Sequence, residues 1–404
     1  MSRATEKTAD EPAAKRETRS PRRDLSGLRE TVVTTFLAIV MALLVGAVLI
    51  SLSYEQSLNS LSYFFSYPWD FFRYSWDAVS TSYLAMVDGS VGSPGAIVDT
   101  LERSAPLICA GLGVTLAFRA GLFNIGAQGQ LIVAALAAGY VGWTWDLPPG
   151  IHLVVSVAAG VLAGGLYGGI VGLLKAQTGA HEVITTIMFN YIASLGILAW
   201  ALFNPAFQRP GQSEPISDRV ADSAAYPSIG SLHLGIVVAL LAAVFLWWLL
   251  DRSTLGFELR AVGSNPDAAR TAGISVSKAY TVAMLLAGAF AGLAATMLVN
   301  GDRFAISDTL FGTIGFDAIT VALLGRGKPL GSVLAGLLFG ALQVGGGAME
   351  ATRVATSPDL AQVLQALIVL FVAAPALVGA LIRRRDRDRT PEAAFAAKAQ
   401  EVEA

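Results

Sequence analysis

Three groups of polar side chains interrupt otherwise apolar stretches of this sequence. In chain order they are Asn124, Gln128 and Gln130; His181, Glu182 and Asn190; and Asp317 and Thr320. An amide or ionisable side chain is costly to bury in a bilayer, so each such residue needs a partner or a role. The pattern predicts a pathway for a polar solute lined by Asn124, Gln128, Gln130, Glu182, Asn190 and Asp317.

The first group lies among glycines that favour a break in a helix. Gly121, Gly126 and Gly129 surround Asn124 and Gln128 in the stretch GLFNIGAQGQ. Backbone groups that are released at a break can bind a polar solute where they line a cavity. A structural alternative stays open, in which the two amide side chains only join neighbouring helices by hydrogen bonds.

His181 and Glu182 also have a structural alternative, as snorkelling or capping groups at the cytoplasmic end of a span. The adjacent pair resembles part of a zinc-protease motif, but the second histidine of HExxH is absent. No G-x-S-x-G elbow occurs, and the Gly-Arg-Gly-Lys of residues 325–328 lacks the spacing and the Ser/Thr of a phosphate loop. Since Cys109 is the only cysteine, a thiolate metal cluster is excluded as well. We therefore expect a non-enzymatic chain with no cofactor of its own.

The composition is that of a membrane protein. Hydrophobic residues make up 54% of the 404 residues and charged residues 14%, and the mean hydropathy is +0.58. Soluble domains usually carry about 25% charged residues. We predict an all-α integral membrane protein with about ten transmembrane helices, because a span needs about 20 apolar residues.

The predicted spans are residues 31–52, 104–118, 131–145, 151–174, 183–203, 234–250, 280–299, 316–324, 330–346 and 360–382. Several of these are short, which predicts broken or partly re-entrant helices near residues 121–130 and 312–325. The predicted domains are a disordered cytoplasmic tail at 1–30, a transmembrane domain at 31–385 and a second cytoplasmic tail at 386–404.

The positive residues orient this arrangement. With both termini in the cytoplasm, the connections that hold Arg119, Lys175, residues 252–278 and Lys328 all fall inside, as the positive-inside rule requires. The segment 204–231, which is rich in proline and poor in lysine, then falls outside. The interval 53–98 is dense in aromatic residues and is interpreted as a belt at the outer membrane interface, with a docking surface for an external partner as the alternative.

Small residues predict where helices pack closely. Gly160, Gly164, Gly168 and Gly172 recur at every fourth position, and the pairs Gly288 with Gly292 and Gly336 with Gly340 repeat this spacing. Residues 130–136 (QLIVAAL) and 317–323 (DAITVAL) align with three identities, although their spans should run in opposite directions. This alignment predicts two inverted repeats, of spans two to five and seven to ten.

The longest charged interval within the apolar part of the chain is residues 251–278. It contains the signals of a short helix at 266–272: Ser264 and Asn265 as N-cap residues, Pro266 at the first position, Asp267 near the positive end of the dipole and Gly273 beyond the last residue. A helix of about two turns is unstable alone in water, so it needs a surface to pack against. The alternative is an ordinary capped connector.

Four stretches carry a resemblance to a known family. RAGLFNIGAQGQ (119–130), GAHEVITTIMFNYIA (179–193), GFELRAVGSNPDAARTAGI (256–274) and GFDAITVALLGRGKPLG (315–331) resemble the permease subunits of ABC importers in the branched-chain amino acid, ribose and nucleoside superfamily, and most of all its nucleoside or simple-sugar branch. Relatives often carry Glu at the position of Gln128 and Asn at that of His181.

The resemblance implies a permease subunit of the bacterial plasma (inner) membrane that imports nucleosides or simple sugars. It implies three partners: an ABC ATPase subunit that binds ATP and magnesium, a second permease chain in a heterodimer, and an extracytoplasmic substrate-binding lipoprotein. Nucleic acid is not among the expected partners. The short helix then resembles the coupling helix, with Arg260, Asn265, Pro266, Asp267, Arg270 and Gly273 as the residues that meet the ATPase.

Two other functions stay open. A branched-chain amino acid permease should offer charges to both ammonium and carboxylate, and no Lys or Arg falls within a predicted span. An ion-coupled secondary transporter or channel would work without ATP.

Overall fold

The computed structural model describes residues 25–212, 214–352, 354 and 358–373. The chain divides into two compact units, of which Ile39–Ala374 is the larger. Of the smaller, Met1–Ala38 with Pro375–Ala404, only residues 25–38 are described, as the first part of α1. Most of the two predicted tails and the end of the tenth predicted span therefore lie outside the described residues.

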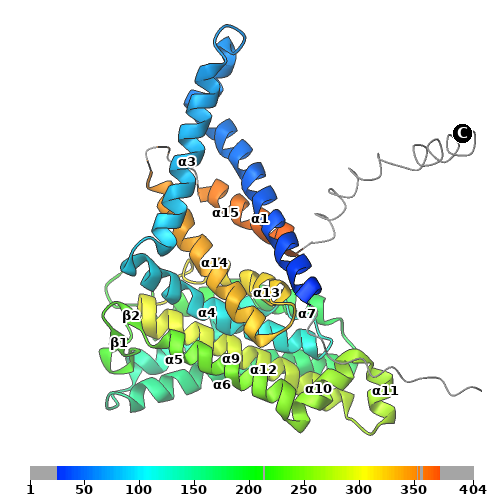
Figure 1. Ribbon diagram of the computed structural model, residues 1–404. Helices are drawn as coiled ribbons and strands as arrows, with labels where there is room; N and C mark the ends of the chain where they lie inside the picture. The colour runs from blue at the N-terminus through cyan, green and yellow to red at the C-terminus, as the bar shows by residue number, and fades with distance from the viewer. Residues whose placement is uncertain (1–24, 213, 353, 355–357, 374–404) are drawn as a thin grey trace, which may run out of the picture. The chain divides into compact units, whose positions relative to one another are not determined.

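The described residues are helical apart from loops and one short β-hairpin (Figure 1). The α-helices are α1 (Leu25–Ser53), α2 (Glu55–Ser60), α3 (Trp69–Val91), α4 (Pro94–Arg119), α5 (Ala127–Thr144), α6 (Ile151–Thr178), α7 (Glu182–Tyr191), α8 (Ala199–Leu202), α9 (Gly235–Arg252), α10 (Thr254–Ser264), α11 (Pro266–Thr271), α12 (Val276–Met297), α13 (Ile314–Leu324), α14 (Pro329–Glu350) and α15 (Pro358–Ala373). Short 3₁₀ helices η1 (Leu61–Tyr63) and η3 (Asp222–Ala224), π-helical segments η2 (Ile192–Leu198) and η4 (Leu298–Arg303), and the antiparallel strands β1 (Ser228–Ile229) and β2 (Leu232–His233) complete the structure.

Six of the described helices are long and apolar enough to cross a membrane. They are Pro94–Arg119, Ile151–Thr178, Glu182–Leu202, Gly235–Arg252, Val276–Arg303 and Pro329–Glu350. A seventh candidate is the pair Ile39–Ser53 and Glu55–Tyr63, which is bent by 74°. The all-α membrane architecture is thus confirmed, whereas the count of about ten spans and the inverted repeats remain predictions.

The predicted breaks are present in the structure. Residues 120–126 separate α4 from α5, and Gly121 has a φ of 75°. Helix α13 has 11 residues, which is about half of what a full span needs, and follows the non-helical residues 304–313. Both α5 and α13 therefore begin directly after a non-helical segment.

Glycines bring α6 and α12 into backbone contact, as their spacing predicts. A Cβ added at Gly164 would lie 2.5 Å from the carbonyl oxygen of Gly288, and one at Gly292 would lie 2.5 Å from that of Gly160. At Gly336 on α14, an added Cβ would lie 2.5 Å from a side-chain atom of Ile108 on α4. These helices pack too closely for larger residues.

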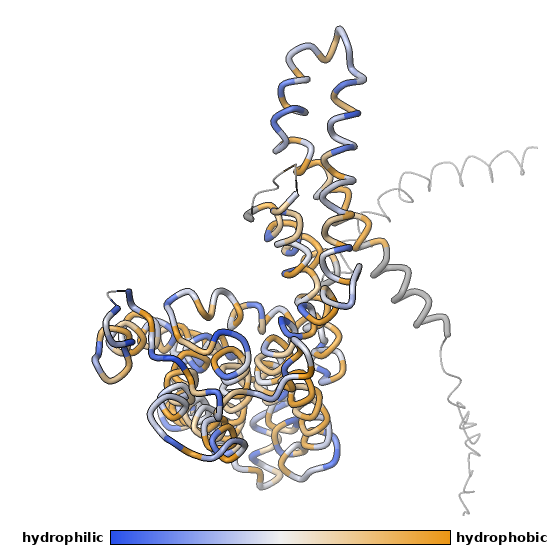
Figure 2. Tube along the Cα trace, turned by 90° about the vertical axis from the view of Figure 1, so that its left-hand side faces the viewer, coloured by the Kyte–Doolittle hydropathy of each residue, from blue (hydrophilic) through white to orange (hydrophobic). Residues whose placement is uncertain are grey.

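The aromatic interval forms a helical hairpin; its position at the outer membrane interface remains a prediction. It runs from the end of α1 through α2 and η1 into α3, and Figure 1 shows it extending away from α4, α9 and α12. Phe64 packs edge-on against Phe71, and Phe65 is fully exposed. In Figure 2 the far end of this hairpin is largely white and blue, whereas the helices below it are mostly orange.

Two connections mark opposite ends of the helix bundle. Helix α9 lies between strand β2 and helix α10 in the chain. Its 18 residues separate β2 from α10 by about 27 Å. Figure 1 shows β1 and β2 at one end of the bundle and α10 with α11 at the other. The predicted outer segment 204–231 and the predicted cytoplasmic loop 251–278 therefore lie at opposite ends, which their assigned sides require.

Candidate functional site

The larger polar cavity lies between α13, α14 and α15 and has a volume of about 720 Å³. Asp317, near the start of α13, lines this cavity, and Thr313 and Thr320 line it as well. Arg103 of α4 and Gln343 of α14 contribute from the neighbouring helices. Ligand pockets usually measure about 300–1,000 Å³, so this cavity has room for a small polar solute.

Asp317 is the predicted pathway residue that the structure places directly in this cavity. Its Oδ2 accepts hydrogen bonds from Thr313 Oγ1 at 2.9 Å and from Gln343 Nε2 at 2.9 Å. Gln343 Oε1 in turn accepts from Arg103 Nε at 2.8 Å. Three helices are thus connected by one chain of side chains, Arg103 to Gln343 to Asp317, all of them half-buried.

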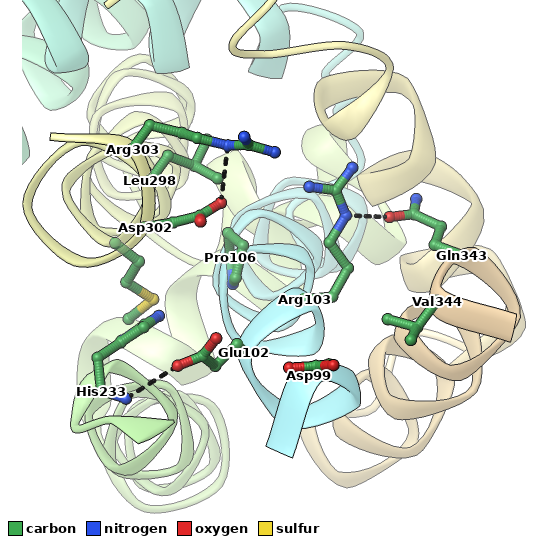
Figure 3. A pocket seen from close by; sticks show the side chains of 11 residues that line it. Asp99, Glu102, Arg103, Pro106, His233, Leu298, Asp302, Arg303, Gln343 and Val344 are labelled. Atoms are coloured by element: carbon green, nitrogen blue, oxygen red, sulfur yellow. Dashed lines mark hydrogen bonds and ion pairs between the residues drawn. The ribbon is translucent and has the colours of Figure 1, made fainter. Parts of the chain in front are cut away.

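A second cavity of about 310 Å³ lies next to these hydrogen-bonded side chains (Figure 3). Arg103 and Gln343 line it as well, so they form part of the walls of both cavities. The remaining charged lining is mixed in sign and consists of Asp99, Glu102, His233, Asp302 and Arg303. Arg303 Nε lies 3.3 Å from Asp302, and the backbone N–H of His233 donates to Glu102 at 3.2 Å.

His233 is held in its neutral form. Its side chain is buried, and its Nδ1 accepts a hydrogen bond from the backbone N–H of Gly235 at 3.1 Å. Burial lowers the pKa of the His233 imidazole, and the nearby Asp302 carboxylate opposes that shift only in part. The ring therefore acts as an acceptor rather than as a cation.

Gln128 connects the two broken segments. The N–H of Gly315, in the first turn of α13, donates to Gln128 Oε1 at 2.8 Å, and Gln128 Nε2 donates to the carbonyl of Gly312 at 3.1 Å. The N-cap residue Thr313 makes no capping bond of its own, so the amide of Gln128 takes over this role. An added Cβ at Gly315 would collide with the backbone of Gln128, which explains the glycine.

Asn124, Gln130 and Asn190 stabilise the break after α4 and line neither cavity. Asn124 Nδ2 donates to Gln130 Oε1 at 3.1 Å, and both side chains are 1% exposed. Asn190 accepts from the backbone N–H of Gly129 at 2.8 Å and donates to the carbonyl of Ile125 at 2.9 Å. For Asn124 these contacts are those of the structural alternative, in which amides join the helices, and Gln130 and Asn190 make contacts of the same kind.

Glu182 begins α7 and pairs with Lys175 at the end of α6, with 2.9 Å between Nζ and Oε2. It lines neither cavity. Glu182 is thus held by Lys175 across the connection between α6 and α7. Of the six predicted pathway residues, the structure brings Asp317 into the larger cavity and Gln128 against the backbone of the same helix; the other four lie elsewhere.

Arg103 was missed because of where the second span was predicted to begin, whereas Gln343 lies inside the predicted span 330–346 and was not singled out there. The structure starts α4 at Pro94, with Ser93 as N-cap accepting from Ala96 N at 3.1 Å, so the predicted start at residue 104 is too late. Arg103 lies within this candidate span, whereas the predicted spans contained no Lys or Arg. The Ser-Pro pair at 93–94 is the signal that could have revealed the earlier start.

The predicted short helix is present as α11, one residue shorter than expected. Asn265 is its N-cap and accepts from Asp267 N and Ala268 N, each at 3.0 Å, while Gly273 beyond its end has a φ of 84°. Ala269 is the buried residue that anchors it. Of the remaining side chains, most are exposed.

The charged residues of this region pair with one another in the isolated chain. Arg270 lies 2.9 Å from Asp267 and Arg260 lies 2.9 Å from Asp251. Exposed pairs of this kind contribute little to stability and exchange partners readily. They remain available to a docking protein.

Close backbone contacts connect this region to α13. Gly263 of α10 packs so tightly on the turn after α4 that an added Cβ would collide with the carbonyl of Arg119. The Arg119 side chain donates through Nε to the carbonyl of Gly327 at 2.6 Å, in the turn that follows α13. A displacement of α10 would therefore act on the turn after α4 and, through the Arg119 side chain, on the turn that follows α13.

Comparison with known proteins identifies the family of this protein. Residues 96–373 match the model of a family described as the branched-chain amino acid transport system / permease component. The guanosine ABC transporter permease protein NupP of Bacillus subtilis is 42% identical over 301 residues, covering 73% of this chain and 86% of its own length. The glucose ABC transporter permease protein TsgB13 of Haloferax volcanii is 35% identical, covering 72% of this chain and 79% of its own length.

The nucleoside ABC transporter permease protein NupB of Lactococcus lactis is 32% identical, covering 75% of this chain and 86% of its own length. No solved structure is significantly similar to the chain.

Proposed function

This chain belongs to the permease component family of branched-chain amino acid transport systems, as an ABC transporter permease of the nucleoside and sugar branch, and we propose that it translocates nucleosides or related simple sugars across a bacterial plasma membrane. It is a transport subunit rather than an enzyme. In this proposal both termini are cytoplasmic, and ATP and magnesium bind to a separate ATPase subunit. A second, non-identical permease chain and an extracytoplasmic binding lipoprotein complete the transporter.

The observation that carries the proposal is the polar cavity at Asp317. A carboxylate flanked by two threonines and an amide suits a solute rich in hydroxyl groups, because each of these groups accepts or donates hydrogen bonds to a hydroxyl. The cavity is open along α13, α14 and α15, where the second permease chain would close it. The solute would then pass between the two permease chains.

Helix α11 would transmit the movement of the ATPase to the membrane helices. Its cap and its buried Ala269 hold it against the protein, while its exposed residues are free to occupy a groove of the ATPase. Closure of the ATPase would push α11 and α10, and the contacts of Gly263 and Arg119 would pass this displacement to α13. Because α13 carries Asp317, the same movement would change the cavity.

A branched-chain amino acid is the second candidate solute. Arg103 and Asp317 supply a cation and an anion to one cavity, which is what a zwitterion requires. However, both groups already take part in one hydrogen-bonded chain through Gln343, which reduces their capacity for new partners.

Competition for uptake distinguishes the two candidates. Proteoliposomes that contain the complete transporter are supplied with labelled guanosine and an excess of unlabelled uridine, ribose or leucine. We expect ATP-dependent guanosine uptake that nucleosides inhibit and leucine does not. Uptake that only leucine inhibits, or transport of leucine in place of guanosine, would overturn the proposed solute.

A further inference from the structure

Gln343 occupies a distinctive place, because it is shared by both polar cavities and lies between two charged groups of opposite sign. Its Oε1 accepts from Arg103 Nε at 2.8 Å, and its Nε2 donates to Asp317 Oδ2 at 2.9 Å. These two partners come from α4 and α13, and Gln343 itself lies on α14. Neither Gln343 nor Arg103 belongs to the predicted pathway.

The partners dictate the orientation of the amide. A guanidinium can only donate hydrogen bonds and an ionised carboxylate can only accept them. The amide oxygen must therefore face Arg103 and the amide nitrogen must face Asp317. A reversed amide would set two donors against each other at Arg103 and two acceptors against each other at Asp317.

The oriented amide keeps hydrogen-bonding capacity for a solute. After these two bonds, Gln343 retains one N–H and one lone pair on its oxygen. Both bonds to Asp317 end on Oδ2, so within the described part of the chain Oδ1 has no partner. Since both residues line the larger cavity, Gln343 and Asp317 together keep one donor and two acceptors for a solute, a set that fits two adjacent hydroxyl groups.

We propose that Gln343 is a specificity-determining residue that, together with Asp317, recognises the adjacent hydroxyls of a ribose ring, and that Arg103 is the positioning residue that orients its amide. This assignment rests on the proposed function, in which the solute is a nucleoside or a simple sugar. It adds a preference for ribose over deoxyribose at this position.

If the hydrogen-bonded side chains Arg103, Gln343 and Asp317 had only a structural role, a different result would be expected. An amide that only joined α4, α13 and α14 would, when removed, weaken the binding of every solute equally or destabilise the protein. A hydroxyl-reading amide affects only solutes that carry the hydroxyls, because a site built to hydrogen-bond a hydroxyl discriminates against the analogue that lacks it.

The experiment measures equilibrium binding of labelled guanosine and 2′,3′-dideoxyguanosine to the purified permease and ATPase assembly without the binding protein. We expect the wild-type assembly to bind guanosine about tenfold or more tightly than the dideoxy analogue, which is the usual effect of one or two hydrogen bonds. Gln343→Met should raise the Kd for guanosine to that of the analogue and leave the Kd of the analogue unchanged.

Second variants keep the test decisive if that protein folds poorly. Gln343→Glu preserves size and the bond from Arg103 but loses the donor to Asp317, so it should lose the preference for guanosine as well. Arg103→Met should have the same effect, whereas Arg103→Lys, which can still donate to Oε1, should restore part of the preference. Gln177→Met, an exposed change of the same type on α6, is the matched control and should keep the wild-type ratio.

Three results would overturn the assignment. The first is an unchanged ratio of the two Kd values in the Gln343 variants while wild type prefers guanosine. The second is an equal rise of both Kd values, which indicates a structural role. The third is absence of nucleoside binding by the wild-type assembly, which would remove the proposed solute together with this assignment, whereas the first two leave the proposed solute standing.

Discussion

At the scale of single residues, Gln128 connects two helices that each begin within the bundle. Its amide supplies the capping acceptor that Thr313 does not supply, and it also donates to the carbonyl of Gly312. The amide therefore contributes to the stability of the short helix that carries Asp317. A residue first singled out for solute contact is thus in contact with the backbone that presents the solute site.

Replacing Gln128 tests this role. Gln128→Leu removes both bonds and leaves the Gly315 N–H without an acceptor, so we expect a loss of about 1–3 kcal/mol in stability and reduced uptake. Gln128→Glu keeps the acceptor at the positive end of α13 but cannot donate to Gly312, so its loss should be smaller. Thermal unfolding of the purified protein measures both, with Gln177→Leu as control; equal unfolding temperatures for all three variants would contradict the role.

The buried His233 predicts a dependence of stability on pH. Burial lowers the pKa of its imidazole below the ordinary value, so at acidic pH the unfolded chain binds a proton that the folded chain does not. Stability should therefore decrease as the pH falls below about 6.5, the usual pKa of histidine. The unfolding temperature of wild type should drop more than that of His233→Gln between pH 7.5 and pH 5.5, and parallel drops would show that His233 is not responsible.

At the scale of elements, α11 shows how a six-residue helix is kept in place. A cap at one end, a left-handed glycine at the other and a single buried alanine replace the length that such a helix lacks. The sequence predicted these features correctly because capping depends on residue types that are adjacent in the chain. The two charged pairs were not predicted, although Arg270 and Asp267 are three residues apart on one helix; the pair of Arg260 with Asp251 joins α10 to α9 and depends on how these helices pack.

Removing the cap should uncouple transport. Asn265→Ala deletes the bonds to the backbone of Asp267 and Ala268, which costs about 0.5–2 kcal/mol of helix stability. We expect ATP-driven uptake to fall several-fold and less ATPase to remain bound to the purified permease. Ser264→Ala is the matched control, because the neighbouring Ser264 is not the cap; equal effects of the two substitutions would argue against α11 as the contact with the ATPase.

At the scale of the whole molecule, the apolar runs and the glycine spacing predicted an all-α membrane protein and the close packing of α6 with α12, but not helix α3 or the first residues of α4. The breaks near Gly121 and Gly312 were also predicted, because glycine and polar residues mark them within the sequence. The hydrogen bonds that connect Arg103, Gln343 and Asp317 were not predicted. Arg103 and Gln343 are 240 residues apart, and a charged residue indicates the end of a span as long as its distant partner is unknown.

The contacts of the amides around Asn124 could not be predicted from the sequence either. The sequence indicated that they lie among apolar residues, but only the fold shows that Asn124 and Gln130 are bonded to each other and away from the cavities. Which of several buried polar residues faces a cavity depends on how helices rotate against their neighbours. That rotation is set by tertiary packing rather than by local pattern.

In the proposed mechanism, this protein forms a gate whose energy comes from a separate ATPase. The direct test is concentrative uptake of a labelled nucleoside into proteoliposomes that contain either the complete transporter or this chain without the ATPase, each with ATP present. We predict accumulation above the external concentration only with the ATPase, and none when its ATP hydrolysis is blocked. Accumulation by this chain alone, driven by an imposed ion gradient, would contradict the account.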